Sequence, residues 1–153
     1  MHVIAAKAVA FLEALQPSFK VYIENVLNNA KILSNRLVER GYEVLTGGTD
    51  NHLLVLKLNE ISGKEASDLL NNVGIVCNKN SIPFDIRPPA ISSGVRLGSP
   101  ACTTRGMMAL EFSQIADMIA DTLDSILDNN IEHVIPRVKE DVSELCKKFP
   151  LPY

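Results

Sequence analysis

The sequence predicts an α+β fold in which several helices pack against one small sheet. The expected order is helix, helix, strand, strand, helix, strand, strand, helix, helix, so helices group around few strands. Hydrophobic residues make up 46% of the 153 residues, which is enough for a packed core. Because the strands are few and the outer helices long, we expect this chain alone to leave part of the sheet uncovered.

Two helices open the chain. A helix over residues 3–15 ends before Pro17, because a proline disfavours helical backbone in the residue that precedes it. A second helix begins near Phe19 and carries apolar side chains at spacings of four and three, which places them on one face. These side chains are Phe19, Ile23, Val26, Ala30, Leu33 and Leu37. Gly41 is a suitable stop, since glycine adopts the left-handed conformation that closes helices.

Residues 42–45 and 53–58 are predicted strands, separated by a turn at Gly47 and Gly48. The second strand is almost wholly apolar, which is typical of burial on both faces. Ser62 and Glu65 have the spacing of a capping box and start a helix to about residue 72. A strand over residues 75–77 follows.

Residues 78–89 contain three prolines and are predicted to be irregular, followed by a strand over residues 93–97. Thr103 and Thr104 are expected to cap a long amphipathic helix over residues 108–126. A last helix covers residues 131–149. Pro136 is compatible with it only if it lies in the first turn.

Composition excludes several classes of function. The formal net charge is −3 without a basic stripe, which argues against a nucleic-acid partner. No run reaches the roughly 18 to 20 apolar residues of a membrane helix, and Lys7 and Glu13 argue against a signal peptide. Three cysteines without CxxC spacing argue against a zinc site or a disulfide framework and favour a cytoplasmic location.

A polar, glycine- and proline-containing stretch over residues 77–105 is the candidate site. Arg96 lies between Val95 and Leu97 in a predicted strand and is flanked by two glycines. An arginine held there is placed to bind a carboxylate through two parallel hydrogen bonds. The alternative is a solvated strand-edge arginine or a structural ion pair, and the local pattern alone favours that alternative.

Other polar residues have simpler interpretations. Asn80 fits a turn-capping role. His52 has no partners at catalytic spacing and is interpreted as structural. The cysteines lie in apolar surroundings and are interpreted as packing residues. Gly47 and Gly48 lack the context of a phosphate-binding loop.

Several strings together resemble one family. They are MHVIAAKAVAF, NAKILSNRLVERGYEVLTGGTDNHL, SGKEA, NKNSIPFD and SSGVRLGSPACTTRG. In this order and spacing they resemble the C-terminal region of serine hydroxymethyltransferases, and the likeness runs from Met1 to the FPLPY end. GGTDNH, NKNSIPFD and SGVRLGSPA followed by TRG are its most specific parts.

The resemblance implies the small C-terminal domain of a fold-type-I transferase that uses pyridoxal 5′-phosphate, with a small antiparallel sheet. Such enzymes move a one-carbon unit between serine and tetrahydrofolate and yield glycine. By this resemblance Arg96 corresponds to the arginine that binds the substrate carboxylate. Asn80 corresponds to a folate-contacting asparagine, and Lys79 and Ser81 would line the same loop.

The family's Schiff-base lysine lies in a segment without a counterpart here, so the resemblance implies no catalytic residue in this chain. Lys7 and Lys79 stand where the family has lysines of other roles. Met1 resembles an internal methionine of a longer protein. Ser99, Met107 and Cys102 depart conservatively from the family pattern.

The resemblance also divides the chain. Residues 1–40 would join a larger domain to a small domain over residues 41–153. Alone, the chain is expected to be inactive, to bind no cofactor and to form homo-oligomers through exposed apolar surface. Two alternatives are a non-catalytic module that binds an amino acid or a folate, and the remnant of a broken gene.

Overall fold

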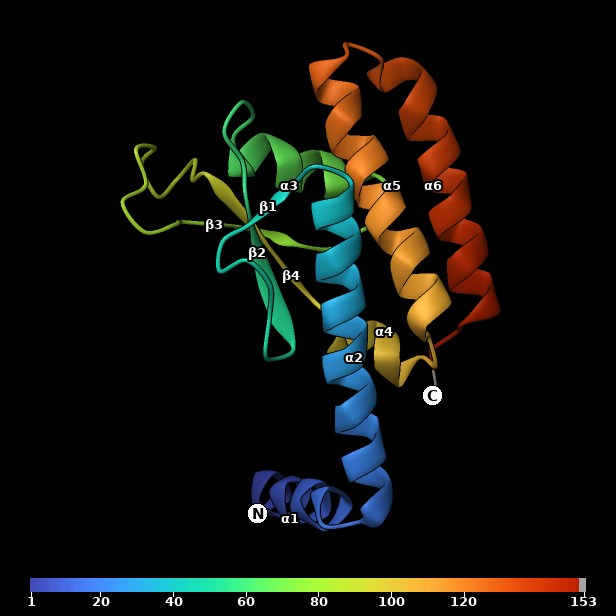
Figure 1. Cartoon of the computed structure of the whole chain (residues 1–153). Coiled ribbons are helices and arrows are strands. Elements are labelled where there is room, and N and C mark those ends of the chain that lie inside the picture. The colour runs from blue at the N-terminus through green and yellow to red at the C-terminus, as the bar shows by residue number, and fades with distance from the viewer. Residues whose placement is uncertain (152–153) are drawn as a thin grey trace.

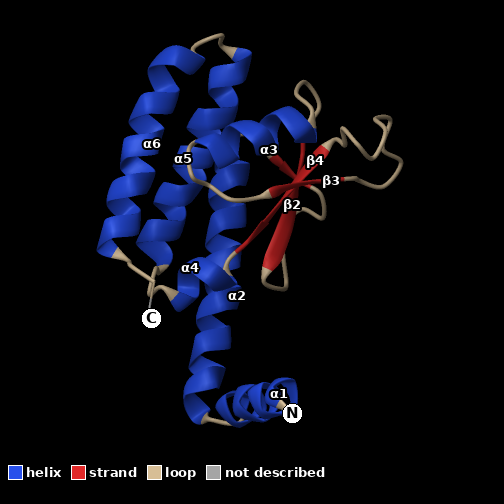
Figure 2. Cartoon of the chain, turned by 180° about the vertical axis from the view of Figure 1, so that it is seen from behind, coloured by secondary structure: helices blue, strands red, loops and turns tan. Residues whose placement is uncertain are grey.

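The computed structural model describes residues 1–151 and shows the predicted α+β fold, with six helices and a four-stranded antiparallel sheet in the order β1-β2-β4-β3. The strands are β1 (Glu43–Val44), β2 (Leu53–Lys57), β3 (Asn78–Asn80) and β4 (Gly94–Gly98). The helices are α1 (His2–Ala14), α2 (Pro17–Glu39), α3 (Gly63–Asn72), α4 (Pro100–Thr104), α5 (Ala109–Leu127) and α6 (Ile131–Lys148). In Figure 1, α2, α5 and α6 stand side by side next to the sheet, and α1 lies across the far end of α2. The view from behind shows the same arrangement (Figure 2).

The core lies between the helices and one face of the sheet. Leu54 and Leu56 of β2 and Val95 and Leu97 of β4 are buried, whereas the alternate residues of these strands are more exposed, except for the buried Gly94. They pack with side chains from the helices, among them Leu33, Leu37, Leu70, Phe112, Ile119 and Leu123. The expectation that residues 53–58 are buried on both faces is therefore wrong for this chain, because the helices cover one face only.

Two glycines end helices as their positions predict. Gly41, with φ of 92°, donates to the carbonyl of Val38, and Tyr42 donates to Leu37. Gly74, with φ of 90°, closes α3 in the same way, since its amide and that of Ile75 bond back into the helix. These are Schellman motifs, which satisfy carbonyls that a helix end leaves free.

Residues 75–77, which were predicted as a strand, do not form one, and the third strand is instead formed by residues 78–80. The Ile75 amide donates to Leu70 to close α3, and the Cys77 amide donates to the side chain of Asn71. With these donors in use, sheet pairing begins one residue later, over the β3 segment, which was expected to be irregular.

Two expectations about the C-terminal helices are also wrong. Thr103 and Thr104 lie inside α4 and do not cap the following helix. The N-cap of α5 is Met108, whose amide donates to the Glu111 carboxylate at 2.9 Å. Pro136 lies in the second turn of α6 rather than the first. Tertiary contacts of α6, including the fully buried Val138, offset the hydrogen bond that proline cannot make.

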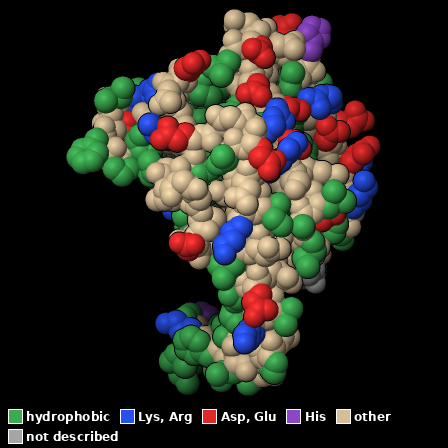
Figure 3. Space-filling view, in the orientation of Figure 1, with side chains coloured by type: hydrophobic (Ala, Val, Ile, Leu, Met, Phe, Trp, Pro, Cys, Tyr) green, Lys and Arg blue, Asp and Glu red, His purple; other side chains and the backbone are tan. Residues whose placement is uncertain are grey.

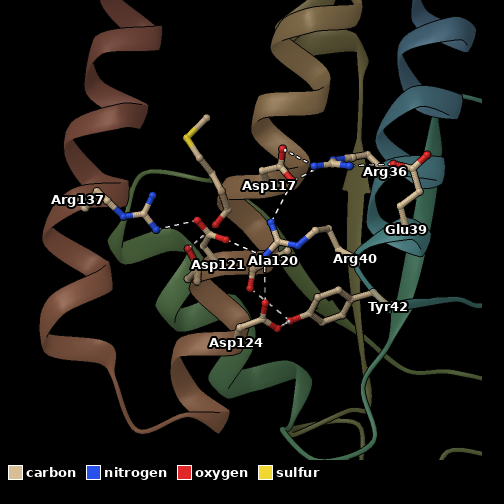
Figure 4. A network of polar contacts seen from close by, with 11 residues as sticks. Arg36, Glu39, Arg40, Tyr42, Asp117, Ala120, Asp121, Asp124 and Arg137 are labelled. Carbon is tan, nitrogen blue, oxygen red and sulfur yellow. Dashed lines mark hydrogen bonds and ion pairs between the residues drawn. The ribbon is translucent and has the colours of Figure 1, made fainter.

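Two arginines near the end of α2 join it to α5 (Figure 4). Arg36 binds both carboxylate oxygens of Asp117, at 3.0 and 3.2 Å. Arg40 donates to Asp117, Asp121 and Asp124 at 3.0, 2.7 and 3.1 Å. A planar guanidinium suits this branched geometry, so the pair of helices is held in one register.

The same network reaches Tyr42, directly before β1, and α6. The hydroxyl of Tyr42 donates to Asp124 at 2.5 Å, and burial together with that bond raises the pKa of Tyr42 well above its usual value. Arg137 of α6 donates to Asp121 at 2.7 Å. Burial opposes ionisation of Asp121, but its bonds with Arg137 and Arg40 prevail and lower its pKa.

Candidate carboxylate site on the open sheet face

Arg96 lies at the centre of β4 and its side chain is exposed, while its neighbours Val95 and Leu97 are buried. It therefore stands on the face of the sheet opposite the helices. Its Cα partners in the sheet are Val55 on β2 and Asn78 on β3. Among residues 1–151 no group accepts a hydrogen bond from its guanidinium, so the alternative of a structural ion pair does not hold for these residues, whereas the exposure of Arg96 agrees with the alternative of a solvated arginine.

Two asparagines of β3 share the face of Arg96. Asn78 is directly opposite Arg96, and Asn80 is opposite Gly94. Cross-strand partners point to the same side of a sheet, so both asparagines and Arg96 lie on one face. Gly94 permits this close approach, because a Cβ there would be 2.8 Å from the Asn80 carbonyl oxygen.

Two of the other predicted residues are placed differently. Lys79 is the partner of Val95, which faces the core, so its side chain leaves the sheet on the side opposite Arg96. The hydroxyl of Ser81 lies 3.4 Å from that of Ser92, and its carbonyl accepts a 2.7 Å bond from Asn80. The structure thus joins Asn80 and Ser81 but separates Lys79 from Arg96.

An open cavity of about 490 Å³ adjoins Arg96. Its lining residues are His52, Leu53, Val76, Cys77, Asn78, Arg96, Leu97 and Gly98. Burial raises the pKa of Cys77 to about 11, so this thiol remains neutral. His52, interpreted as structural, is exposed at the cavity, and its carbonyl accepts a 3.0 Å bond from Ser99.

Asn78 lies in the polar stretch that was predicted as the candidate site but was given no specific role there, and His52 was interpreted as structural; both line the cavity of Arg96. For Asn78 a signal existed, because it is two residues from Asn80 and shares its face wherever the segment is a strand. For His52 no sequence signal existed, because the register between β2 and β4 brings it beside Gly98.

The loop between β3 and β4 is held at its base by one acid. The carboxylate of Asp85 accepts from the amides of Ile82, Arg87 and Ser93, and from the Ser93 hydroxyl at 2.6 Å. The Ser93 hydroxyl contributes most to lowering the pKa of Asp85, and the amides add to it against the cost of desolvation, which leaves that pKa at about 2. Arg87 in turn donates to the carbonyls of Leu58 and Asn59.

The tip of that loop is apolar and exposed. Phe84 is 101% exposed and adopts a φ of 58°, and Ile86 is 93% exposed. The space-filling view shows hydrophobic side chains gathered on this loop and on α1 (Figure 3). The loop therefore presents apolar groups from a fixed base next to the face that carries Asn80.

The arrangement is suited to binding a small carboxylate but does not by itself fit pyridoxal 5′-phosphate. An uncommitted guanidinium on an open face can hold a carboxylate through two bonds. A Schiff base to the cofactor needs a lysine, and in the described part of the chain no lysine lines the Arg96 cavity. Within residues 1–151 there is also no cluster of three or more potential metal ligands, and no helix long and apolar enough to cross a membrane.

Fold and site together define an α+β domain whose open sheet face carries an uncommitted arginine next to a rigid, apolar-tipped loop. A family model described as serine hydroxymethyltransferase matches residues 1–119. The chain is 52% identical to the serine hydroxymethyltransferase of Rickettsia akari over 98% of its own length. It is 48% identical to that of Orientia tsutsugamushi over 99% of its length.

The chain belongs to the serine hydroxymethyltransferase family. It spans only 36% of the length of the Rickettsia akari protein and 40% of that of Orientia tsutsugamushi, which fits the C-terminal portion of such a protein.

Proposed function

We propose that the chain forms the C-terminal part of a serine hydroxymethyltransferase that uses pyridoxal 5′-phosphate to convert serine and tetrahydrofolate into glycine and methylenetetrahydrofolate. The remaining part of the enzyme would hold the cofactor and its lysine. This chain would supply the substrate-carboxylate arginine and a folate-contacting loop. Residues 1–40 would join the two parts, and residues 41–153 would form the small domain.

One observation carries the proposal: the Arg96 guanidinium is exposed on the open sheet face and has no partner among residues 1–151. A structural arginine is normally paired, as Arg36 and Arg40 are in this molecule. An unpaired arginine flanked by Gly94 and Gly98 leaves room for a ligand beside it. A substrate carboxylate supplies the matching charge and geometry.

The folate assignment rests on the β3 edge. Asn80 shares the face of Arg96 and is followed by the rigid loop with Phe84 at its tip. We assign Asn80 to the folate, with Ser81 beside it. Lys79 points away from Arg96, so any contact that it makes with the folate would come from the other side of the strand.

The decisive experiment replaces the matching region of the Rickettsia akari enzyme, 52% identical, by this chain. We expect the chimaera to convert serine to glycine and Arg96→Gln to raise KM for serine strongly, because losing a charge-assisted bidentate contact costs about 2 to 3 kcal/mol. Lys139→Gln, which removes an exposed charge on α6, is the matched control and should leave KM unchanged.

An unchanged KM in the Arg96→Gln chimaera would remove the carboxylate assignment. A folded chimaera with bound cofactor and no turnover would contradict the proposed function. Calorimetric titration of the chain alone with glycine, serine and a folate tests the alternative of a non-catalytic binding module, which requires selective, sub-millimolar binding. The proposal predicts at most weak binding, since the rest of the site is absent.

A further inference from the structure

A second cavity lies on the helix side of the sheet. It has a volume of about 290 Å³ and opens where the end of β4 and the α3–β3 connection meet α4, α5 and α6. Its inner wall is the hydrophobic core, contributed by Leu33, Leu97, Met107, Phe112, Ile119 and Leu145. Its outer wall includes Val76, Ala101, Cys102, Ile115, Val142 and Cys146.

The wall is apolar except at one place. Arg105 is the only charged residue among those that line the cavity. Its Nε donates to the Phe149 carbonyl at 2.7 Å and its Nη2 donates to the Cys146 carbonyl at 3.1 Å, which caps the end of α6. Within residues 1–151 its Nη1 makes no hydrogen bond, so the guanidinium that lines this apolar chamber keeps an unused donor.

The size and chemistry of this cavity select a class of ligand. Ligand pockets begin at about 300 Å³, so this chamber suits a single ring or a short branched chain rather than a drug-sized molecule. The apolar wall favours a hydrocarbon body, and a free guanidinium donor favours an anionic head. Both features are needed, since a purely apolar ligand would leave the Nη1 donor of Arg105 unused and a small anion would leave the apolar wall in contact with water.

We propose that this cavity is a binding site for a small apolar monocarboxylate, with its ring or chain against Phe112 and Ile115 and its carboxylate on Arg105. A ligand there contacts α4, α5 and α6 at once and reinforces the attachment of α6, the outermost helix. The two cavities adjoin, since Val76, Leu97 and Gly98 line both, but Arg96 lines only the first and Arg105 only the second, so the two anion-binding groups differ.

The cysteines provide the test, because Cys102 and Cys146 line this cavity and Cys77 lines the one at Arg96. The whole chain is alkylated with N-ethylmaleimide in the presence of 3-phenylpropionate, its amide or 3-phenylpropylamine, and each cysteine is followed by peptide mass mapping. At ten times its dissociation constant the acid should slow alkylation of Cys102 and Cys146 about tenfold. The amide should protect less and the amine not at all.

Variants separate binding from folding. Ala101→Phe places a ring at the cavity mouth and should abolish protection, whereas Ala10→Phe, the same change on exposed α1, should preserve it. Arg105→Lys should keep the preference for the acid and Arg105→Gln should lose it.

Equal protection by acid and amine, protection that survives Ala101→Phe, or protection of Cys77 alone would each overturn the proposal. So would the absence of protection by all three compounds. Protection of Cys77 by glycine would concern only the Arg96 site.

Discussion

At the scale of single residues, some ionisable side chains are fully committed to structural contacts, whereas Arg96 is not. Asp85 accepts four hydrogen bonds and Arg40 binds three carboxylates, so both fix the backbone or the helices around them. Arg96 has no described partner and faces outward. This contrast matters because the free guanidinium of Arg96 has the charge and the planar geometry to bind a ligand carboxylate.

Asp85 gives a prediction at this scale. The pKa of its carboxyl is about 2 in the folded chain against an ordinary 3.8, so the folded state favours the charged form. The resulting stabilisation is present above pH 3.8 and is lost as the pH falls toward 2. The stability advantage over Asp85→Asn should shrink in that window.

Carboxyl-carbon NMR titration of the folded chain measures the effect directly. We expect a midpoint for Asp85 near 2, and the Ser93→Ala variant should move it upward because the largest of the favourable bonds is lost. A midpoint at the ordinary 3.8 in the wild-type chain would show that the loop is not held by this carboxylate.

At the scale of elements, helices were the easiest part to predict. Their caps and periodicity are local, so Gly41, Gly74 and the Ser62–Glu65 capping box ended or started helices where expected. The capping box is complete, since Ser62 and Glu65 each accept from the other's amide, at 3.1 Å. Short strands were harder, because β3 consists of three polar residues whose only reason to be extended is their pairing with β4.

The candidate site shows the same limit. Glycine-flanked Arg96 was visible in the sequence, but its lack of a partner was not, because partners come from tertiary neighbours. Asn78 and His52 join its cavity through strand register, which no local pattern encodes. The alternation that separates Lys79 from Asn80 required knowing that the segment is a strand.

Gly63 gives a prediction at the element scale. It begins α3 directly against β4, and a Cβ there would lie 2.3 Å from the Gly94 carbonyl oxygen. Gly63→Ala should therefore push the helix from the strand that carries Arg96 and cost about 3 kcal/mol of unfolding free energy. At Gly98 an added Cβ meets nothing closer than 3.4 Å, so Gly98→Ala should cost only about 0.5 kcal/mol. Urea unfolding of both variants measures these losses of unfolding free energy. Equal losses for Gly63→Ala and Gly98→Ala would contradict the close approach of α3 to β4.

At the scale of the whole molecule, the exposed apolar surface is larger than a solitary domain needs. None of the residues of α1 is buried: Phe11 and Leu12 are 68% and 61% exposed, and Leu15, directly after the helix, is 80% exposed. Its polar side chains are few, so apolar groups face several directions, which is typical of a helix enclosed by protein. The chain spans 36% of the length of the Rickettsia akari relative, and an exposed apolar surface of this kind is typical of a site of contact with other protein.

The isolated chain should consequently self-associate through α1. Burying Phe11 and Leu12 contributes about 2 kcal/mol each, so Phe11→Gln with Leu12→Gln should weaken association by more than about a hundredfold. Sedimentation velocity over a range of concentrations should show oligomers for the wild-type chain and monomers for the double variant. Lys139→Gln, an exposed change on α6, should sediment like the wild type.

If the wild-type chain is strictly monomeric, α1 is not an associating surface. If the double variant still forms oligomers, the contact lies elsewhere, and the loop tip with Phe84 and Ile86 is the next apolar surface to change.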